Sequence, residues 1–156
     1  CHIADVLETT AEMLEESILI NLTVPFLLTK AALPIMIGNG GGAIVNISSI
    51  ATMRDGSVPA YAAAKAGMEA LTRSTACTYG RRGIRANAVV VGSVDTPLRR
   101  ATVPGEYKPR KSALPTEGNG WDIAQAALFL ASDDAAHITA VMLPVDSGAT
   151  ALTPGN

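Results

Sequence analysis

The fold of this chain is decided by GAIVNISSIA (42–51) and, a few residues later, AYAAAKAGMEALTRS (60–74). Residues 43–47 form a β-branched run that is too short for a helix and apolar enough for burial on both faces, which predicts an inner strand of a parallel sheet. The alanine-rich segment follows Pro59, a residue that the first turn of a helix tolerates, and predicts a helix over residues 59–79. The pair is therefore a strand, a loop and a long helix.

The same alternation continues on both sides of this unit. It predicts helices over residues 9–37 and 121–132, and strands over residues 85–91 and 141–145. Thr9 or Thr10 is expected to cap the first helix, whose early acidic residues suit its positive end. Alternating helices and strands predict an α/β layer structure with a parallel sheet in one domain.

Three details qualify this arrangement. The glycine run at residues 38–42 follows a helix and precedes a strand, so it is interpreted as a turn. Pro144 cannot donate a ladder hydrogen bond, so its strand is placed at a sheet edge or its end. Residues 97–120 contain four prolines and show no usable period, which predicts a long loop or lid beside a ligand.

Composition excludes several classes of protein. The chain of 156 residues is 48% hydrophobic and 17% charged, which is typical of a globular protein, and its net charge of -2 gives no footprint for nucleic acid. Residues 17–38 are apolar but broken by polar residues and prolines, so they predict a buried helix and no membrane span. Cys1 and Cys77 fit no disulfide or zinc pattern and His2 and His137 have no metal spacing, which predicts a cytoplasmic protein without a metal site.

Tyr61 and Lys65 carry the candidate chemistry. Four residues apart on a predicted helix, they share a face, although such a pair also arises by chance on helix surfaces. The preceding strand ends in Ser48 and Ser49, so a hydroxyl there could bind a substrate oxygen beside a nicotinamide ring while the tyrosine donates or removes its proton. Because a free tyrosine has a pKa near 10, the charge of Lys65 is expected to lower the pKa of Tyr61; at about 4 Å it is worth roughly 4 kcal/mol.

With two further segments, IRANAVVVGSVDTP (84–97) and FLASDDAAHITAVMLPVDSG (129–148), the sequence resembles the short-chain dehydrogenase/reductase family in motif order and spacing. The resemblance implies a doubly wound, Rossmann-type α/β fold, of which this chain carries the last three strands with their helices. It also implies NAD or NADP as cofactor and a small secondary alcohol or ketone as substrate. Family members commonly pair their long helices, so a homo-oligomer, a dimer or tetramer, is expected through residues 10–37 and 59–79.

The resemblance also assigns the catalytic residues. Ser49 is the family's catalytic serine, with Ser48 as the alternative, Tyr61 is the acid/base, and Lys65 lowers its pKa and holds the nicotinamide ribose. INLTVPF (20–26) matches the family's asparagine motif at Asn21. Pro25 has no N–H, so the Asn21 carbonyl is free to hold a water of the family's proton relay; the alternative is a simple helix kink.

Further positions follow from the later segments. Gly92, Val94 and Thr96 match the segment that fixes the nicotinamide carboxamide, although Val91 stands where the family has proline. Ala140 and Ser147 stand where the family often has glycine.

The family's glycine-rich pyrophosphate turn has no counterpart in this sequence. The chain (1–156) is therefore expected to be the catalytic part of a longer domain, inactive and unable to bind NAD or NADP usefully alone, with a bare edge on the strand at 43–47. Two alternatives stay open: a non-catalytic remnant that serves as a structural or interaction module, and a relative with epimerase or dehydratase chemistry. Five cations between residues 99 and 111 either attract an anionic substrate or belong to a solvated loop.

Overall fold

A computed structural model describes residues 3–54, 56–92, 94–97, 100 and 111–152. Its centre is a three-stranded parallel sheet with the order β1 (Gly42–Ser49), β2 (Ile84–Val91) and β3 (Met142–Val145). Val91 lies opposite both Ser49 and Val145, so the carboxyl ends of the strands lie level with one another. The predicted α/β fold with a partial Rossmann-type sheet is confirmed.

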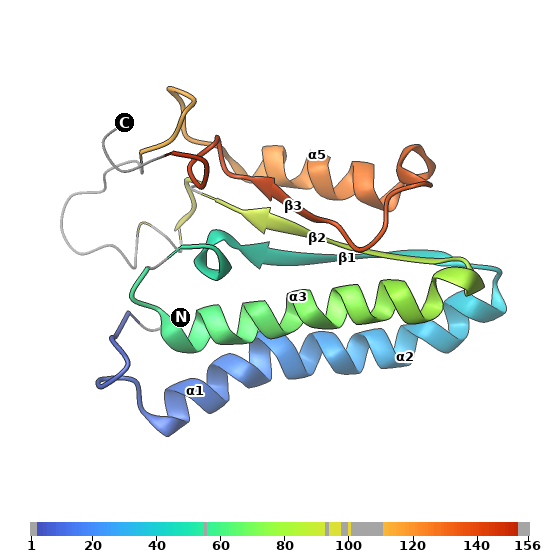
Figure 1. Cartoon of the computed structure of the whole chain (residues 1–156), viewed down its shortest axis with the longest axis horizontal. Helices are drawn as coiled ribbons and strands as arrows, with labels where there is room; N and C mark the ends of the chain where they lie inside the picture. The colour runs from blue at the N-terminus through green and yellow to red at the C-terminus, as the bar shows by residue number, and fades with distance from the viewer. Residues whose placement is uncertain (1–2, 55, 93, 98–99, 101–110, 153–156) are drawn as a thin grey trace.

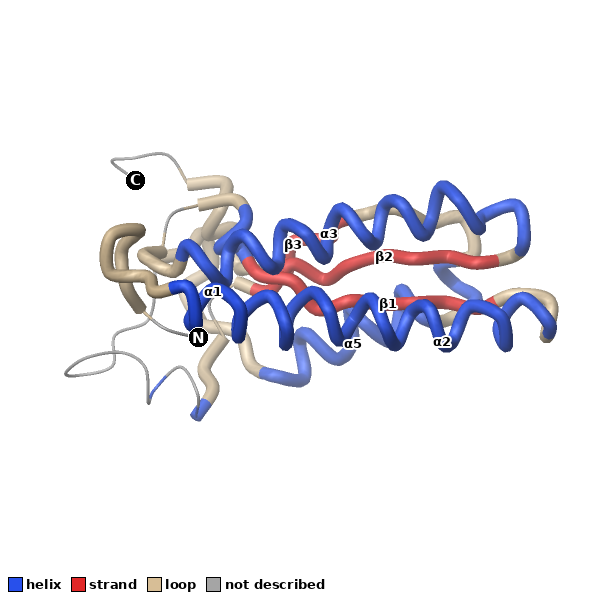
Figure 2. Tube along the Cα trace, turned by 90° about the horizontal axis from the view of Figure 1, so that it is seen from below, coloured by secondary structure: helices blue, strands red, loops and turns tan. Residues whose placement is uncertain are grey.

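Helices cover both faces of the sheet (Figure 1). A long amino-terminal helix and α3 (Pro59–Tyr79) lie on one face, and α5 (Gly120–Ala131) lies on the other. Figure 2 shows the amino-terminal helix and α3 running side by side along the strands. Each helix therefore has one end beside the carboxyl ends of the strands.

The amino-terminal helix is two α-helices joined by a wider turn. α1 (Ala11–Ile18) begins after Thr10, whose Oγ1 accepts a hydrogen bond from the Met13 amide at 3.3 Å, as predicted. A π-helical turn (Leu19–Thr23) then leads into α2 (Val24–Gly38). The Val24 N–H reaches back five residues to the Leu19 carbonyl, because Pro25 offers no N–H to the Asn21 carbonyl.

β2 forms the core. Its side chains are almost wholly buried because strands flank it on both sides and helices pack on both of its faces. Met68 of α3 and Leu130 of α5 are buried as well. The predicted place of Pro144 at a sheet edge is confirmed, since β3 pairs only with β2 among the described strands.

The prediction that residues 43–47 form an inner strand buried on both faces is wrong. Within the described residues β1 pairs with β2 alone, and the Ile47 side chain is 44% exposed. The Gly42 amide donates to the Gly83 carbonyl, so in a parallel ladder the even-numbered residues of β1 bond to β2. Ala43, Val45, Ile47 and Ser49 direct their backbone groups to the free edge, as expected for a strand with a bare side.

The prediction of a buried amino-terminal helix is also wrong. Within the helix Ala11–Gly38, an 18-residue stretch has a mean hydropathy of 1.7, yet only 11% of that stretch is buried. By length and composition alone the helix could cross a membrane. Only the side that faces α3 and β1 is covered, and in α2 the buried residues are Thr29 and Leu33. Large apolar side chains are exposed along the helix: Leu19, Ile20, Val24, Phe26, Leu27, Leu28 and Ile35.

Backbone geometry explains the glycine turn before β1 and two residues that adopt a left-handed conformation. The predicted turn at residues 38–42 is confirmed, and a Cβ on Gly41 would lie 2.6 Å from the Gly83 carbonyl oxygen. Ala140 and Ser147 have φ values of 62° and 55°, a left-handed conformation that costs a non-glycine residue about 1 kcal/mol or more. This strain accounts for the glycines that the family often places there.

The segment predicted as a lid is only partly described. Its later part, residues 111–120, contacts the segments that follow β2 and β3. Gly118 forms a β-bridge with Val94, and the Ala113 amide donates to the Ser147 carbonyl at 2.8 Å. Arg100 forms an ion pair with Asp95. Residues 98–99 and 101–110, which include the cations Arg99, Lys108 and Arg110, lie outside the described residues.

Candidate active site

Ser49 and Tyr61 meet where β1 ends and α3 begins. Ser49 is the last residue of β1, and its Oγ accepts from the Ala51 amide at 3.2 Å, which caps the short 3-10 turn Ile50–Thr52. Tyr61 lies in the first turn of α3, and the Ser49 side chain lies near enough to its hydroxyl to lower the pKa of the phenol. The structure therefore brings together two hydroxyls that sequence reasoning paired, at the edge where ligands of such sheets bind.

Lys65 lies one helical turn beyond Tyr61 on the same face. Its Nζ is 5.7 Å from the centroid of the Tyr61 ring, a cation–π distance. The ammonium donates a hydrogen bond of 2.7 Å to the Ile47 carbonyl, which faces the free edge of β1. Lys65 thus joins the cluster through the strand backbone and the tyrosine ring.

The pKa values of this pair are governed by burial. Burial raises the pKa of Tyr61 above its usual value of 10.0, and the hydrogen bond from Ser49 opposes that rise without cancelling it. Burial also lowers the pKa of the Lys65 ammonium. The ammonium lies over the ring and bonds to the Ile47 carbonyl, and the expectation that Lys65 lowers the pKa of Tyr61 stays a prediction.

The structure separates Ser49 from its alternative. Ser48 is 2% exposed, and its hydroxyl donates to Glu69 Oε1 at 2.6 Å, on the side of β1 that faces α3. Thr52 Oγ1 also reaches Glu69 Oε1, at 2.8 Å. Sequence reasoning missed Glu69, although its position four residues after Lys65 places it on the same helical face.

Asn21 lies in the π-helical turn. Its side-chain amide donates to the Ser17 carbonyl at 3.1 Å, and the turn packs against α3 where Leu22 meets Gly67. Among its described hydrogen bonds there is none to Lys65, so the proton relay stays a prediction.

Gly92, Val94 and Thr96 follow the end of β2, beside Ser49. The Gly92 amide donates to the Val145 carbonyl at 3.0 Å, and a Cβ on Gly92 would lie 2.2 Å from the Cβ of Asp146. Val94 is buried and Thr96 is half-buried. Gly92 thus has a clear packing role, while binding of the nicotinamide carboxamide by Gly92, Val94 and Thr96 stays a prediction.

Asp146 braces this corner. Burial would raise the pKa of its carboxyl, but hydrogen bonds from Thr150 and from the Gly148 amide outweigh that influence and leave the pKa lowered. A carboxylate held in this way fixes the turn after β3.

The residues present fit one end of a nicotinamide dinucleotide. The hydroxyls of Ser49 and Tyr61 and the ammonium of Lys65 are donors suited to ribose and carbonyl oxygens. The pyrophosphate needs a strand, a glycine-rich turn and a helix N-terminus in that order, and the described part of the chain contains no such turn.

Comparison with known proteins agrees with the geometry. Residues 2–150 match a family model described as Enoyl-(Acyl carrier protein) reductase. The chain is 38% identical over 144 residues to 2,5-dichloro-2,5-cyclohexadiene-1,4-diol dehydrogenase LinX of Sphingobium indicum, which covers 90% of this chain and 58% of that protein. It is 43% identical over 141 residues to cis-4-hydroxycyclohexanecarboxylate dehydrogenase of Sinomonas cyclohexanicum, covering 85% of this chain and 55% of that protein.

Solved structures show the same fold. A short-chain dehydrogenase/reductase family oxidoreductase from Burkholderia thailandensis superposes with a TM-score of 0.90 at 37% identity, over 97% of this chain and 62% of that one. 4-Hydroxyisoleucine dehydrogenase complexed with NADH superposes with a TM-score of 0.85 at 28% identity, over 97% of this chain and 66% of that one. The chain thus spans little more than half the length of its sequence relatives, and it belongs to the short-chain dehydrogenase/reductase family.

Proposed function

We propose that the intact enzyme, the natural polypeptide that carries this chain, transfers a hydride between NAD or NADP and a secondary alcohol or its ketone. The observation that carries the proposal is the cluster at the end of β1, where Ser49 lies beside the Tyr61 hydroxyl and Lys65 lies over the tyrosine ring. A proton donor beside a second hydroxyl and a fixed cation suits the handling of a carbonyl oxygen that gains or loses charge.

Each residue has a distinct task in this proposal. Ser49 orients the substrate oxygen, and Tyr61 gives that oxygen a proton during reduction or takes it during oxidation. Lys65 contributes positive charge near the phenol and a hydrogen-bond donor for the nicotinamide ribose. The Asn21 carbonyl holds a water molecule that relays protons to Lys65. The bound nucleotide supplies or accepts the hydride on the substrate's carbinol carbon.

Burial gives the proposed reaction a pH direction. Because the pKa of Tyr61 is raised, the phenol stays protonated at neutral pH, which is the form required to protonate a ketone oxygen. Alcohol oxidation requires the phenolate, whose fraction increases with pH. Oxidation should therefore accelerate with rising alkalinity, while reduction should lose rate at high pH.

The relatives suggest which substrates to test first. Two of them are named for alcohols on a six-membered carbon ring, and 7alpha-hydroxysteroid dehydrogenase of Bacteroides fragilis, 36% identical over 144 residues, is named for a ring alcohol as well. We propose a secondary alcohol on a carbocycle as the substrate class.

A deuterium-transfer assay tests the reaction. The intact enzyme is given NAD or NADP and a cyclohexanol deuterated at the carbinol carbon, and the expected result is one deuterium in the reduced nucleotide, with turnover slowed relative to the unlabelled alcohol. Epimerase or dehydratase chemistry would convert a substrate without net label in the nucleotide. A remnant that serves only as a structural module would give no turnover with any alcohol or ketone of the panel.

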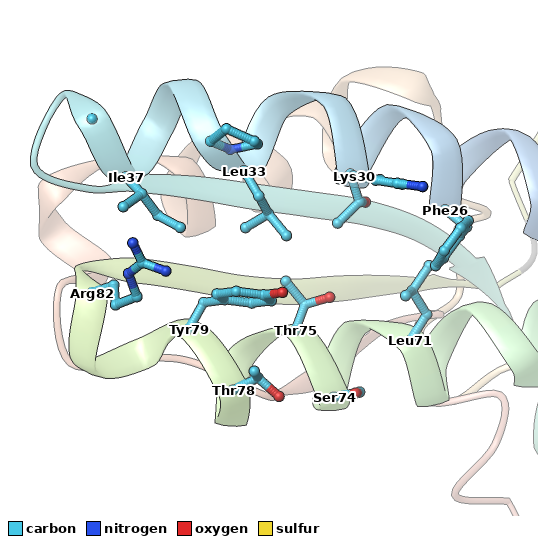
Figure 3. A pocket seen from close by; sticks show the side chains of 13 residues that line it. Phe26, Lys30, Leu33, Ile37, Leu71, Ser74, Thr75, Thr78, Tyr79 and Arg82 are labelled. Carbon is cyan, nitrogen blue, oxygen red and sulfur yellow. The ribbon is translucent and has the colours of Figure 1, made fainter.

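We further propose that the enzyme is a homo-oligomer that covers the exposed face of α2. A groove of about 790 Å³ runs between α2 and α3, with Phe26 facing Leu71 at one end and Leu33 and Ile37 lying over Tyr79 and Arg82 toward the other (Figure 3). An exposed apolar surface of this kind is typical of an interface. A second copy of the chain would cover it, so the helix needs no membrane around it. Cys77 is an exposed free thiol, which agrees with a reducing, cytoplasmic location.

Sedimentation checks the assembly. At micromolar concentration the protein should sediment as a dimer or tetramer, and Phe26→Glu should weaken association at least tenfold, about 1.4 kcal/mol, because it places a charge in the groove. Leu7→Glu is the matched control, since Leu7 is 96% exposed and lies away from the groove. A monodisperse monomer for the unmodified protein would contradict this assembly.

A further inference from the structure

Helix α3 and strand β1 are joined by a row of polar contacts. From the start of the helix onward, Tyr61 lies beside Ser49, Lys65 donates to the Ile47 carbonyl, and Glu69 accepts from Ser48. Farther along, Thr72 Oγ1 accepts from Asn46 Nδ2 at 2.8 Å. The helix that carries the proposed acid/base thus also holds the strand that carries the proposed serine.

Glu69 differs from the others in bonding on both sides of Ser49. Its Oε1 accepts from Ser48, the residue before Ser49, at 2.6 Å, and from Thr52, three residues after it, at 2.8 Å. The Thr52 hydroxyl also lies 2.9 Å from the Ser49 carbonyl, and its single proton serves one of these two acceptors at a time. One carboxyl oxygen therefore clamps both ends of the short segment that presents the Ser49 hydroxyl.

The segment needs such a clamp. Ser49 belongs to an edge strand and is followed by a 3-10 turn of three residues, and the exposed residues Gly56 and Ser57 lie between that turn and α3. The covalent connection therefore constrains the distance between Ser49 and Tyr61 only weakly. Ser48, in contrast, is 2% exposed, so its bond to Glu69 is shielded from water.

We propose that Glu69 is a positioning residue that sets the Ser49 hydroxyl against Tyr61 by holding Ser48 and Thr52. The inference rests on the proposed function for its kinetic consequence, but its structural consequence can be measured without turnover. Glu69 does not touch the substrate in this proposal. It fixes the position of the Ser49 hydroxyl, on β1, relative to Tyr61, which lies on the same helix as Glu69. Misplacement of a reacting group by about 1 Å can cost roughly 100-fold in rate.

The kinetic test compares three variants of the intact enzyme. Glu69→Ala should lower kcat roughly 10- to 100-fold while the KM for nucleotide stays within about twofold, because only the alignment of Ser49 is lost. Glu69→Gln keeps a carboxamide oxygen that can accept both hydroxyls, so it should restore most of kcat. Thr72→Val is the matched control: it breaks the neighbouring bond to Asn46 in the same interface but leaves Ser48 and Thr52 alone, so kcat should stay near that of the unmodified enzyme.

A spectroscopic readout separates this inference from the proposed function. With the tyrosine Cζ carbons labelled with 13C, the signal of Tyr61 is identified by its loss in Tyr61→Phe, and its shift at neutral pH reports the bond with Ser49. Glu69→Ala should move that signal in the same direction as Ser49→Ala, whereas Thr72→Val should leave it in place. This comparison holds even if the enzyme turns over none of the proposed substrates.

Two results would overturn the positioning role. One is an unchanged Tyr61 signal and kcat in folded Glu69→Ala. The other is an equal effect of Thr72→Val, which would mean that any break between α3 and β1 acts through general loosening.

Discussion

Replacing Tyr61 by phenylalanine in the intact enzyme should lower kcat by about 1000-fold or more, while the affinity for the nucleotide changes by less than about twofold. General acid/base catalysis by a positioned side chain contributes on the order of 100- to 10,000-fold, and the phenol oxygen is the only part of Tyr61 that can exchange a proton. Phenylalanine keeps the ring over which Lys65 lies, so the change is confined to the hydroxyl beside Ser49.

Steady-state kinetics and nucleotide fluorescence titration check this result together. Ser49→Ala is the informative comparison, because it removes the orienting hydroxyl but leaves the proton donor, and it should reduce kcat by a smaller factor. If Tyr61→Phe keeps most of the original rate, the acid/base must be another group and the proposed mechanism fails.

Gly92→Ala should destabilise the fold by about 3 kcal/mol or more. The added Cβ would lie 2.2 Å from the Cβ and 2.3 Å from the Cα of Asp146, and those atoms belong to the turn that follows β3. Backbone cannot rotate away as a flexible side chain can, so relief requires β2 and β3 to separate at their carboxyl ends.

Urea unfolding, followed by circular dichroism, measures the difference. Gly80→Ala is the matched control, since Gly80 has a φ of -56° at the end of α3 and no atom lies within 4 Å of its added Cβ. That variant should be neutral or slightly more stable, because alanine restricts the unfolded chain. Equal midpoints for the two variants would show that the contact with Asp146 is not tight in solution.

Local sequence patterns predicted the elements of this fold well. The β-branched runs gave three strands, the glycine run gave a turn, and Pro144 placed β3 at an edge, because each of these signals acts within a few residues. The same patterns failed for burial. A helix has the same apolar composition whether it is packed on all sides or has one side uncovered. The exposure of α2 therefore could not be derived from its composition.

The candidate site shows the same division. The spacing of Tyr61 and Lys65 follows from the helical period, so their shared face was predictable. The roles of Ile47 and Glu69 depend on how α3 is placed along β1, and that placement is set by packing across the interface. No pattern within either segment specifies which carbonyl receives the Lys65 ammonium or which hydroxyls Glu69 accepts.

The all-parallel sheet has a consequence for how fast the chain can fold. Gly42 pairs with Ile84 across the whole of α3, and Ala88 pairs with Met142 across α5, so each strand pair in the described sheet joins distant segments. A hairpin can form early because its closure entropy is small, whereas these pairings must close long loops before the first ladder bond forms. Meanwhile α3 can form on its own and the apolar strands stay exposed. Refolding of this sheet is therefore expected to be slow and most efficient at low protein concentration, where unpaired strands from different molecules rarely meet.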